Sequence, residues 1–109
     1  FDEIDAGVGG ATADAIGEKL AIIASDRQVL CITHVPQIAA RADCHIVVEK
    51  AVVGGRSVSR VRALSDDERV GELARMLGGK VLTDATRRHA EDMYARTRRA
   101  KKTARRKSA

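Results

Sequence analysis

The sequence is poor in aromatic residues, cysteine and long apolar runs: it has one phenylalanine, one tyrosine and no tryptophan among 109 residues. A chain of this length can form one small domain, and aliphatic side chains must fill most of its core. Two cysteines, Cys31 and Cys44, do not provide the disulfide framework of a small secreted protein, and their spacing to nearby histidines matches no usual zinc site. No apolar run approaches the length of a membrane span, and no signal peptide is visible, so we expect a cytoplasmic location.

The chain also begins without methionine and contains no phosphate-binding loop. Its first residue, Phe1, is the last apolar residue expected of a strand, so we expect the chain to be the C-terminal portion of a larger protein. No G-x-x-x-x-G-K-[ST] segment occurs, so no predicted loop would cradle the phosphates of a nucleotide. The chain alone is therefore not expected to hydrolyse a nucleotide.

The net charge of +5 is unevenly distributed. Eight basic residues and no acidic ones occur from Arg96 to the end, which leaves 12 basic against 15 acidic residues before it. We expect residues 96–109 to form a disordered basic tail. Such a tail could add salt-dependent affinity for nucleic acid, or it could only keep the protein soluble. The sequence leaves both open.

The first ten residues combine an acidic pair with a glycine-rich turn. Phosphate transfer needs a hard oxygen ligand for Mg²⁺ and a carboxylate that orients or deprotonates water. Asp2 would suit the first role and Glu3 the second, because both follow the apolar Phe1 directly. An acidic pair is also common at a solvated strand end, and the pair alone favours that simpler interpretation.

The residues that follow predict an α/β fold. After the turn, residues 11–25 have the apolar spacing of a helix, with Ile16, Leu20 and Ile23 on one face. The nearly all-apolar run of residues 28–33 is typical of a strand covered on both faces, as in a parallel sheet. Strand, helix and strand would then form a right-handed βαβ unit.

His34 comes at the carboxyl end of the second predicted strand. Ligands of open α/β sheets bind outside the carboxyl ends of strands. We therefore expect Asp2, Glu3 and His34 to lie at the same edge of the sheet. This convergence is stronger evidence for a site than any of the three residues alone.

The rest of the chain predicts one hairpin and three helices. A short helix should run from Pro36 through Ala42, and residues 44–50 and 57–64 should form a hairpin around two glycines. A capping box at Ser65 should begin a helix that ends near Leu77, with a buried stripe along it. A last, lightly packed helix is expected from about residue 83 or 84 to 99, with disorder from residue 100.

Three separated motifs resemble one protein family. Residues 1–5, FDEID, resemble the Walker B end of an ABC-type ATPase head of the SMC-like class, and residues 31–39, CITHVPQIA, resemble its switch-histidine segment. Together with residues 72–79, ELARMLGG, they resemble the C-terminal end of the RecN family of bacterial DNA repair proteins. The resemblance covers residues 1–95. It implies the C-terminal lobe of a P-loop NTPase head, with parallel strands and flanking helices.

The resemblance implies a role for each matching residue. Asp2 would hold Mg²⁺, and Glu3 would be the general base or water-positioning group of ATP hydrolysis. His34 would contact the γ-phosphate and sense its presence. The implied cofactors are therefore ATP and Mg²⁺, and the phosphate-binding loop, the signature motif and the coiled coil of this class would lie in other parts of a larger protein.

The glycine-rich turn stands where this class carries its D-loop. Gly7, Gly9 and Gly10 would thus meet nucleotide and the opposite head when two heads of a homodimer close around ATP. A D-loop usually ends in Asp, whereas the aligned residue here is Gly9, so the contact across the dimer would differ.

The implied function is ATP binding and hydrolysis in recombinational repair of DNA double-strand breaks, close to the nucleoid, with DNA as partner of the whole protein. One alternative is a non-catalytic nucleic-acid-binding domain that uses the basic tail. Another is an SMC-like head that organises chromosomes.

Overall fold

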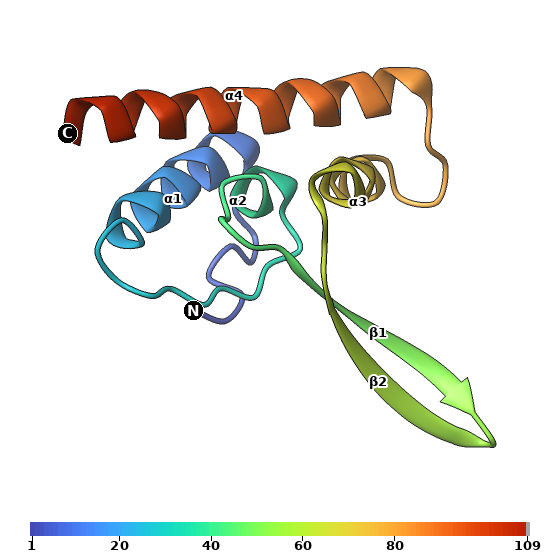
Figure 1. Ribbon diagram of the computed structural model, residues 1–109. Helices are drawn as coiled ribbons and strands as arrows, with labels where there is room; N and C mark the ends of the chain where they lie inside the picture. Colours follow the sequence, from blue (N-terminus) through green and yellow to red (C-terminus); the bar gives the residue numbers. More distant parts are fainter. Residues whose placement is uncertain (109) are drawn as a thin grey trace.

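The computed structural model describes residues 1–108, and the side chains of residues 1–103. Along the chain lie α1 (Gly10–Ile23), α2 (Pro36–Ala39), β1 (Ile46–Val53), β2 (Arg56–Ala63), α3 (Asp66–Gly78) and α4 (Asp84–Ser108). Helix α4 crosses over the other three helices, and the hairpin of β1 and β2 projects away from them (Figure 1). No helix among residues 1–108 is long and apolar enough to cross a membrane.

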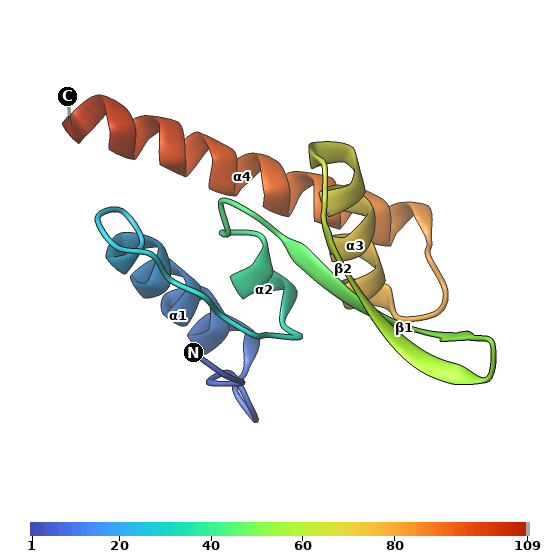
Figure 2. The ribbon, with the colours of Figure 1, turned by 60° about the horizontal axis from the view of Figure 1, so that its bottom comes forward.

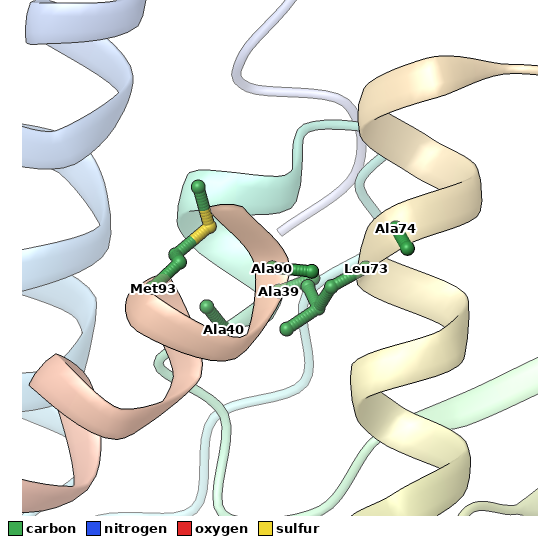
Figure 3. Packing of buried hydrophobic residues seen from close by; sticks show 6 residues of the cluster. All are labelled: Ala39, Ala40, Leu73, Ala74, Ala90 and Met93. Atoms are coloured by element: carbon green, nitrogen blue, oxygen red, sulfur yellow. The ribbon is translucent and has the colours of Figure 1, made fainter. Parts of the chain in front are cut away.

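The core lies where α2, α3 and α4 meet (Figure 3). Leu73 of α3 and Ala90 of α4 are fully buried, and Met93 is 7% exposed. The other buried members of this cluster are Ala39, Ala40 and Ala74. Four of the six buried residues are alanines, so the three helices can approach one another closely. The sequence predicted a lightly packed last helix, whereas two of its residues form part of the centre of the core.

Helix α3 begins as the sequence predicts. The Ser65 side chain accepts a hydrogen bond from the Glu68 backbone N–H, and the Glu68 side chain accepts one from the Ser65 backbone N–H. This reciprocal pair is the predicted capping box. The helix ends at Gly78, and Gly79 follows with a φ of 66°, a conformation that glycine adopts without strain.

The predicted hairpin is confirmed, with its strands shifted by a few residues. Strands β1 and β2 pair antiparallel from Ile46 opposite Ala63 to Val53 opposite Arg56. Gly54 and Gly55 make the turn, with φ values of 58° and 77°. Positive φ at both turn residues matches the right-handed twist of hairpin strands. Figure 2 shows the hairpin extending beyond the helices from a second direction.

The parallel sheet predicted for residues 28–33 is not present among residues 1–108. The only sheet among the described residues is the antiparallel hairpin. The predicted parallel pair of strands is reduced to one bridge between Asp2 and Ile32. Parallel strands are stable where further strands and helices cover both faces. Here Leu30 is 73% exposed and Ile32 57% exposed, so that cover is missing within the described residues. The chain is therefore a small α/β structure.

The basic end of the chain also differs from the prediction. The prediction is a disordered basic tail over residues 96–109, with the last helix ending near residue 99, but α4 continues to Ser108; Ala109 lies outside the described residues. Arginine, lysine and alanine have high helix propensity. Two contacts also attach α4 to the loop after α2: the Thr97 hydroxyl donates to the Ala40 carbonyl at 3.0 Å, and Lys101 Nζ lies 2.6 Å from Asp43 Oδ1.

Candidate functional site

Three backbone hydrogen bonds join the start of the chain to the segment before His34. The Phe1 amino group donates to the Leu30 carbonyl at 2.7 Å, the Ile32 N–H to the Phe1 carbonyl at 2.8 Å, and the Glu3 N–H to the Ile32 carbonyl at 3.0 Å. Asp2 and Ile32 are thus paired in parallel. Because parallel segments run in the same direction, Glu3 and His34 both come after this bridge, at the same end of it.

A buried side-chain contact extends this pairing. Thr33 Oγ1 donates a hydrogen bond to Asp5 Oδ2 and accepts one of 3.0 Å from the Val35 N–H. Asp5 is 1% exposed. Its carboxylate thus links the turn after the acidic pair to Thr33, and the Thr33 hydroxyl in turn holds Val35, the residue after His34.

Sequence reasoning gave Asp5 no role. The signal that could have found it is a third carboxylate placed in the turn between an acidic pair and a glycine. Only one oxygen of this carboxylate has a partner, because Asp5 Oδ1 is buried without a hydrogen bond among the described residues. A buried polar atom without a partner is costly, so Asp5 is strongly dependent on Thr33.

The acidic pair is exposed at the end of the bridge. Neither Asp2 nor Glu3 has a side-chain hydrogen bond or ion pair within the described part of the chain, so both carboxylates can meet a ligand. Glu3 has a φ of 50°, which is uncommon for a residue with a side chain. Such backbone conformations occur at turns and functional sites, where the surrounding contacts impose them. Here the Glu3 N–H bond to Ile32 is one of those contacts.

The remaining predicted site residues are His34 and three glycines of the turn, and all of them come shortly after the bridge residues in the sequence. His34 is exposed and follows Thr33 directly. Gly7 requires glycine because its φ is 73°, whereas Gly9 is the N-cap of α1 in an extended conformation without a side-chain cap. A methyl group on Gly10 would lie 3.7 Å from Gln37 Nε2, an ordinary contact. Gly7 is thus required by the fold, while Gly9 and Gly10 are not.

The donor set fits magnesium better than it fits a whole nucleotide. Within residues 1–108, no group of three or more His, Cys, Asp or Glu side chains could hold a metal ion. Mg²⁺ commonly uses one or two carboxylates and takes its other ligands from water and phosphate oxygens, so Asp2 alone is compatible with it. The sequence offers no glycine-rich loop to hold the phosphates. The residues present therefore fit the metal and water side of such a site.

Cys31 lies beside the bridge but is not a ready nucleophile. Burial raises the pKa of the Cys31 thiol, and the Asp5 carboxylate raises it further, although the positive N-terminus opposes them. A raised pKa keeps the thiol protonated and unreactive. Cys31 therefore serves as a small apolar residue beside the bridge rather than as a nucleophile.

No family model matches the chain, but segments of several known proteins are similar to it. It is 50% identical to the DNA repair protein RecN of Halalkalibacterium halodurans over 93 residues, which are 85% of this chain and 16% of that protein. It is 54% identical over 95 residues to the protein of that name from Deinococcus radiodurans, covering 87% of this chain and 17% of that protein. The chain is thus closely similar to one segment of RecN-type DNA repair proteins.

A third relative extends the match. The DNA repair protein RecN of Bacillus subtilis is 46% identical over 103 residues, which are 94% of this chain and 18% of that protein. The resemblance inferred from the three motifs is therefore confirmed. The chain spans about a sixth of the length of the relatives it matches.

Proposed function

We propose that the chain forms part of the ATPase head of a RecN-type DNA repair protein, with Asp2, Glu3 and His34 in one nucleotide site. The observation that carries this proposal is the parallel bridge between Asp2 and Ile32. It brings the ends of two separate motifs together, as the strands of an ABC/SMC-type head require. In the complete head this bridge is one part of a larger parallel sheet. Helices packed on the faces of that sheet cover Leu30 and Ile32.

Each residue has a role that its chemistry supports. Asp2 holds Mg²⁺ through a carboxylate oxygen, and magnesium, when bound, neutralises charge on the phosphates. Glu3 orients or deprotonates the attacking water, because its exposed carboxylate has no competing partner among the described residues. His34 contacts the terminal phosphate. Thr33 and Asp5 fix the position of the two motifs relative to each other.

Other parts of the RecN-type protein complete the site. They supply the phosphate-binding loop, and a second head meets the turn that contains Gly7 and Gly9 in a homodimer. DNA is the partner of the whole protein, which works in recombinational repair in the cytoplasm, near the nucleoid. The names of the relatives, all DNA repair proteins, support repair over the SMC-like chromosome-organising alternative.

The test uses a chimera in which this chain replaces the matched segment of the Deinococcus radiodurans protein. ATP hydrolysis is measured with and without DNA, beside ATP binding. Glu3→Gln should reduce turnover on the order of 100-fold or more while ATP still binds, because it removes a carboxylate needed only in the chemical step. Glu18→Gln, an exposed substitution on α1, is the matched control and should leave turnover unchanged. Equal turnover in the two variants would contradict the catalytic role of Glu3.

A second candidate is a non-catalytic nucleic-acid-binding function of the basic end. It is favoured by the extension of α4 through the basic residues to Ser108, which arranges them along one helix. Deleting residues 96–109 separates the two candidates. DNA binding by the chimera should largely persist if the chain serves as part of an ATPase head. It should be lost if the basic end of α4 is the DNA-binding element.

A further inference from the structure

A small basic cavity lies between α3, α4 and the loop after α2. Its volume is about 240 Å³, and its lining residues are Ala42, Asp43, Arg69, Arg98, Lys101 and Lys102. Four of the six are cations and one is an acid. None of them belongs to the candidate nucleotide site.

Arg69 forms the buried part of this cavity. It is 4% exposed, and its guanidinium donates to the Ala42 carbonyl at 2.6 Å and to the Asp43 carbonyl at 3.4 Å. Within the described residues it has no ion pair, and its Nε–H is buried without an acceptor. The Asp66 carboxylate interacts electrostatically with Arg69, and the Tyr94 ring lies 5.0 Å from its guanidinium, but its hydrogen bonds go only to neutral groups. A buried cation in this setting has part of its desolvation cost uncompensated. An anion in the cavity would compensate for it.

The other charges of the cavity differ in how far they are already neutralised. Lys101 is paired with Asp43 at 2.6 Å, and Arg98 is paired with Asp66. Lys102 is exposed and has no ion pair or hydrogen bond within residues 1–103. The two carboxylates balance two cations, so Arg69 and Lys102 leave a net charge of +2 for a ligand.

The size of the cavity and its position select the kind of anion. Pockets that enclose a whole drug-sized ligand have volumes of about 300–1,000 Å³, so this cavity suits a single phosphate group better than a nucleotide. It also lies at the side of a helix whose basic residues continue through Lys107 in the sequence. Further basic residues along the sequence of the same helix favour a chain of phosphates over a free ion.

We propose that this cavity binds one backbone phosphate of DNA, with Arg69 and Lys102 as its unpaired cations. The bound phosphate would fix the register of α4 on the DNA, and the other basic residues of the helix would contribute non-specific attraction. This inference does not rest on ATP hydrolysis by the candidate site. It is tested without nucleotide, so that either proposal can fail alone.

The experiment compares two variants of the whole chain, Lys102→Ala and Arg99→Ala. Both remove one exposed cation from α4, but Arg99 does not line the cavity. Binding of labelled duplex DNA is followed by fluorescence anisotropy over a range of salt concentrations. Lys102→Ala should weaken binding about five- to tenfold at low salt and lower the salt slope by about 1, whereas Arg99→Ala should weaken it less than about twofold. Lys102→Arg should keep most of the affinity, and circular dichroism verifies that every variant remains helical.

A second arm titrates inorganic phosphate and follows the Nε–H resonance of Arg69 by NMR. A shift in the wild-type chain that is reduced in Lys102→Ala would support a phosphate in the cavity. Equal losses of DNA affinity in Lys102→Ala and Arg99→Ala would overturn the proposal, because α4 would then act as undifferentiated charge. If phosphate binds while the two variants bind DNA equally, the cavity takes a free anion and the DNA assignment is wrong.

Discussion

Thr33 donates a hydrogen bond to the buried carboxylate of Asp5, across 28 residues of sequence. Thr33 precedes His34, and Asp5 follows the acidic pair by two residues, so this one contact joins the two motifs of the candidate site. The Asp2–Ile32 bridge aligns the backbones, and the Thr33 hydroxyl then fixes how they continue. The position of His34 relative to Glu3 therefore depends on a threonine and an aspartate that were not among the predicted site residues.

Replacing Thr33 by valine should destabilise the chain by about 2 kcal/mol. The substitution keeps the side-chain shape but leaves the Asp5 carboxylate buried without a donor and the Val35 N–H without its acceptor. Urea denaturation followed by circular dichroism measures the change. Thr12→Val, at an exposed position of α1, is the control and should shift the free energy of unfolding by no more than about 0.5 kcal/mol. Equal effects of the two substitutions would show that the Thr33–Asp5 contact contributes little.

Local signals predicted much of the fold. The capping box of Ser65 and Glu68 and the glycine pair of the hairpin each act over a few residues, so the sequence alone located both. The parallel strand predicted for residues 28–33 is reduced to one bridge at Ile32. Local sequence cannot predict such a strand reliably, because a parallel sheet depends on partner strands that are distant in sequence. Leu30 and Ile32 have the apolar character of such a strand but remain exposed in this structure.

The candidate site shows the same division. Motif spacing predicts Asp2, Glu3 and His34 as site residues, and the bridge places their two segments side by side. The third carboxylate in the turn marks Asp5 only weakly in the sequence, because its importance comes from burial and from one long-range partner. The basic cavity was also missed, since Arg69 and Lys102 are 33 positions apart and only packing of α3 against α4 brings them together.

The stability of the chain should rise with pH in the range just below 6.5, because of His45. Burial lowers the pKa of His45, and the positive charge of Arg69 lowers it further, although Glu72 opposes this. The unfolded chain, with the ordinary pKa of 6.5, therefore binds the proton more tightly than the folded chain. The stabilising contribution is complete above 6.5 and is lost as the pH falls through the lower folded-state pKa.

His45→Gln should flatten this part of the pH profile. The variant and the wild-type chain are compared by urea denaturation at closely spaced pH values, with pH 8 as the reference, where both residues are neutral. The folded chain also has lowered pKa values for Asp66, Glu68 and Glu72, so protonation of these carboxylates at still lower pH destabilises it. That loss of stability should persist in the variant. An unchanged slope just below pH 6.5 in His45→Gln would contradict the assignment to His45.

Two substitutions of Tyr94 should separate its hydroxyl from its ring. The hydroxyl donates to Asp66 at 2.6 Å, and the guanidinium groups of Arg69 and Arg98 each lie 5.0 Å from the ring centre. Tyr94→Phe keeps the ring and should cost about 1 kcal/mol, whereas Tyr94→Leu also removes the ring from the buried Arg69 and should cost about 2 kcal/mol. Thermal unfolding measures both. Equal costs would mean that the ring faces contribute nothing to holding Arg69.

Two glycines of α3 should respond differently to replacement by alanine. A methyl group on Gly71 would meet no atom within 4 Å, whereas one on Gly78 would lie 2.9 Å from Thr86 Cγ2 and 3.3 Å from Thr86 Oγ1. Alanine is favoured over glycine in a helix by about 0.5–1 kcal/mol, so Gly71→Ala should stabilise the chain by that amount.

Gly78→Ala gains less from helix propensity, because Gly78 is the last residue of α3. The added methyl group must also displace Thr86, whose backbone N–H donates to the Thr83 hydroxyl. The hydroxyls of Thr83 and Thr86 are 2.9 Å apart, so Thr86 cannot rotate away without breaking that contact at the start of α4. We expect Gly78→Ala to be less stable than Gly71→Ala by at least about 1 kcal/mol, measured by urea denaturation. If both variants are equally stabilised, α3 and α4 are not held as closely at this end as the structure indicates.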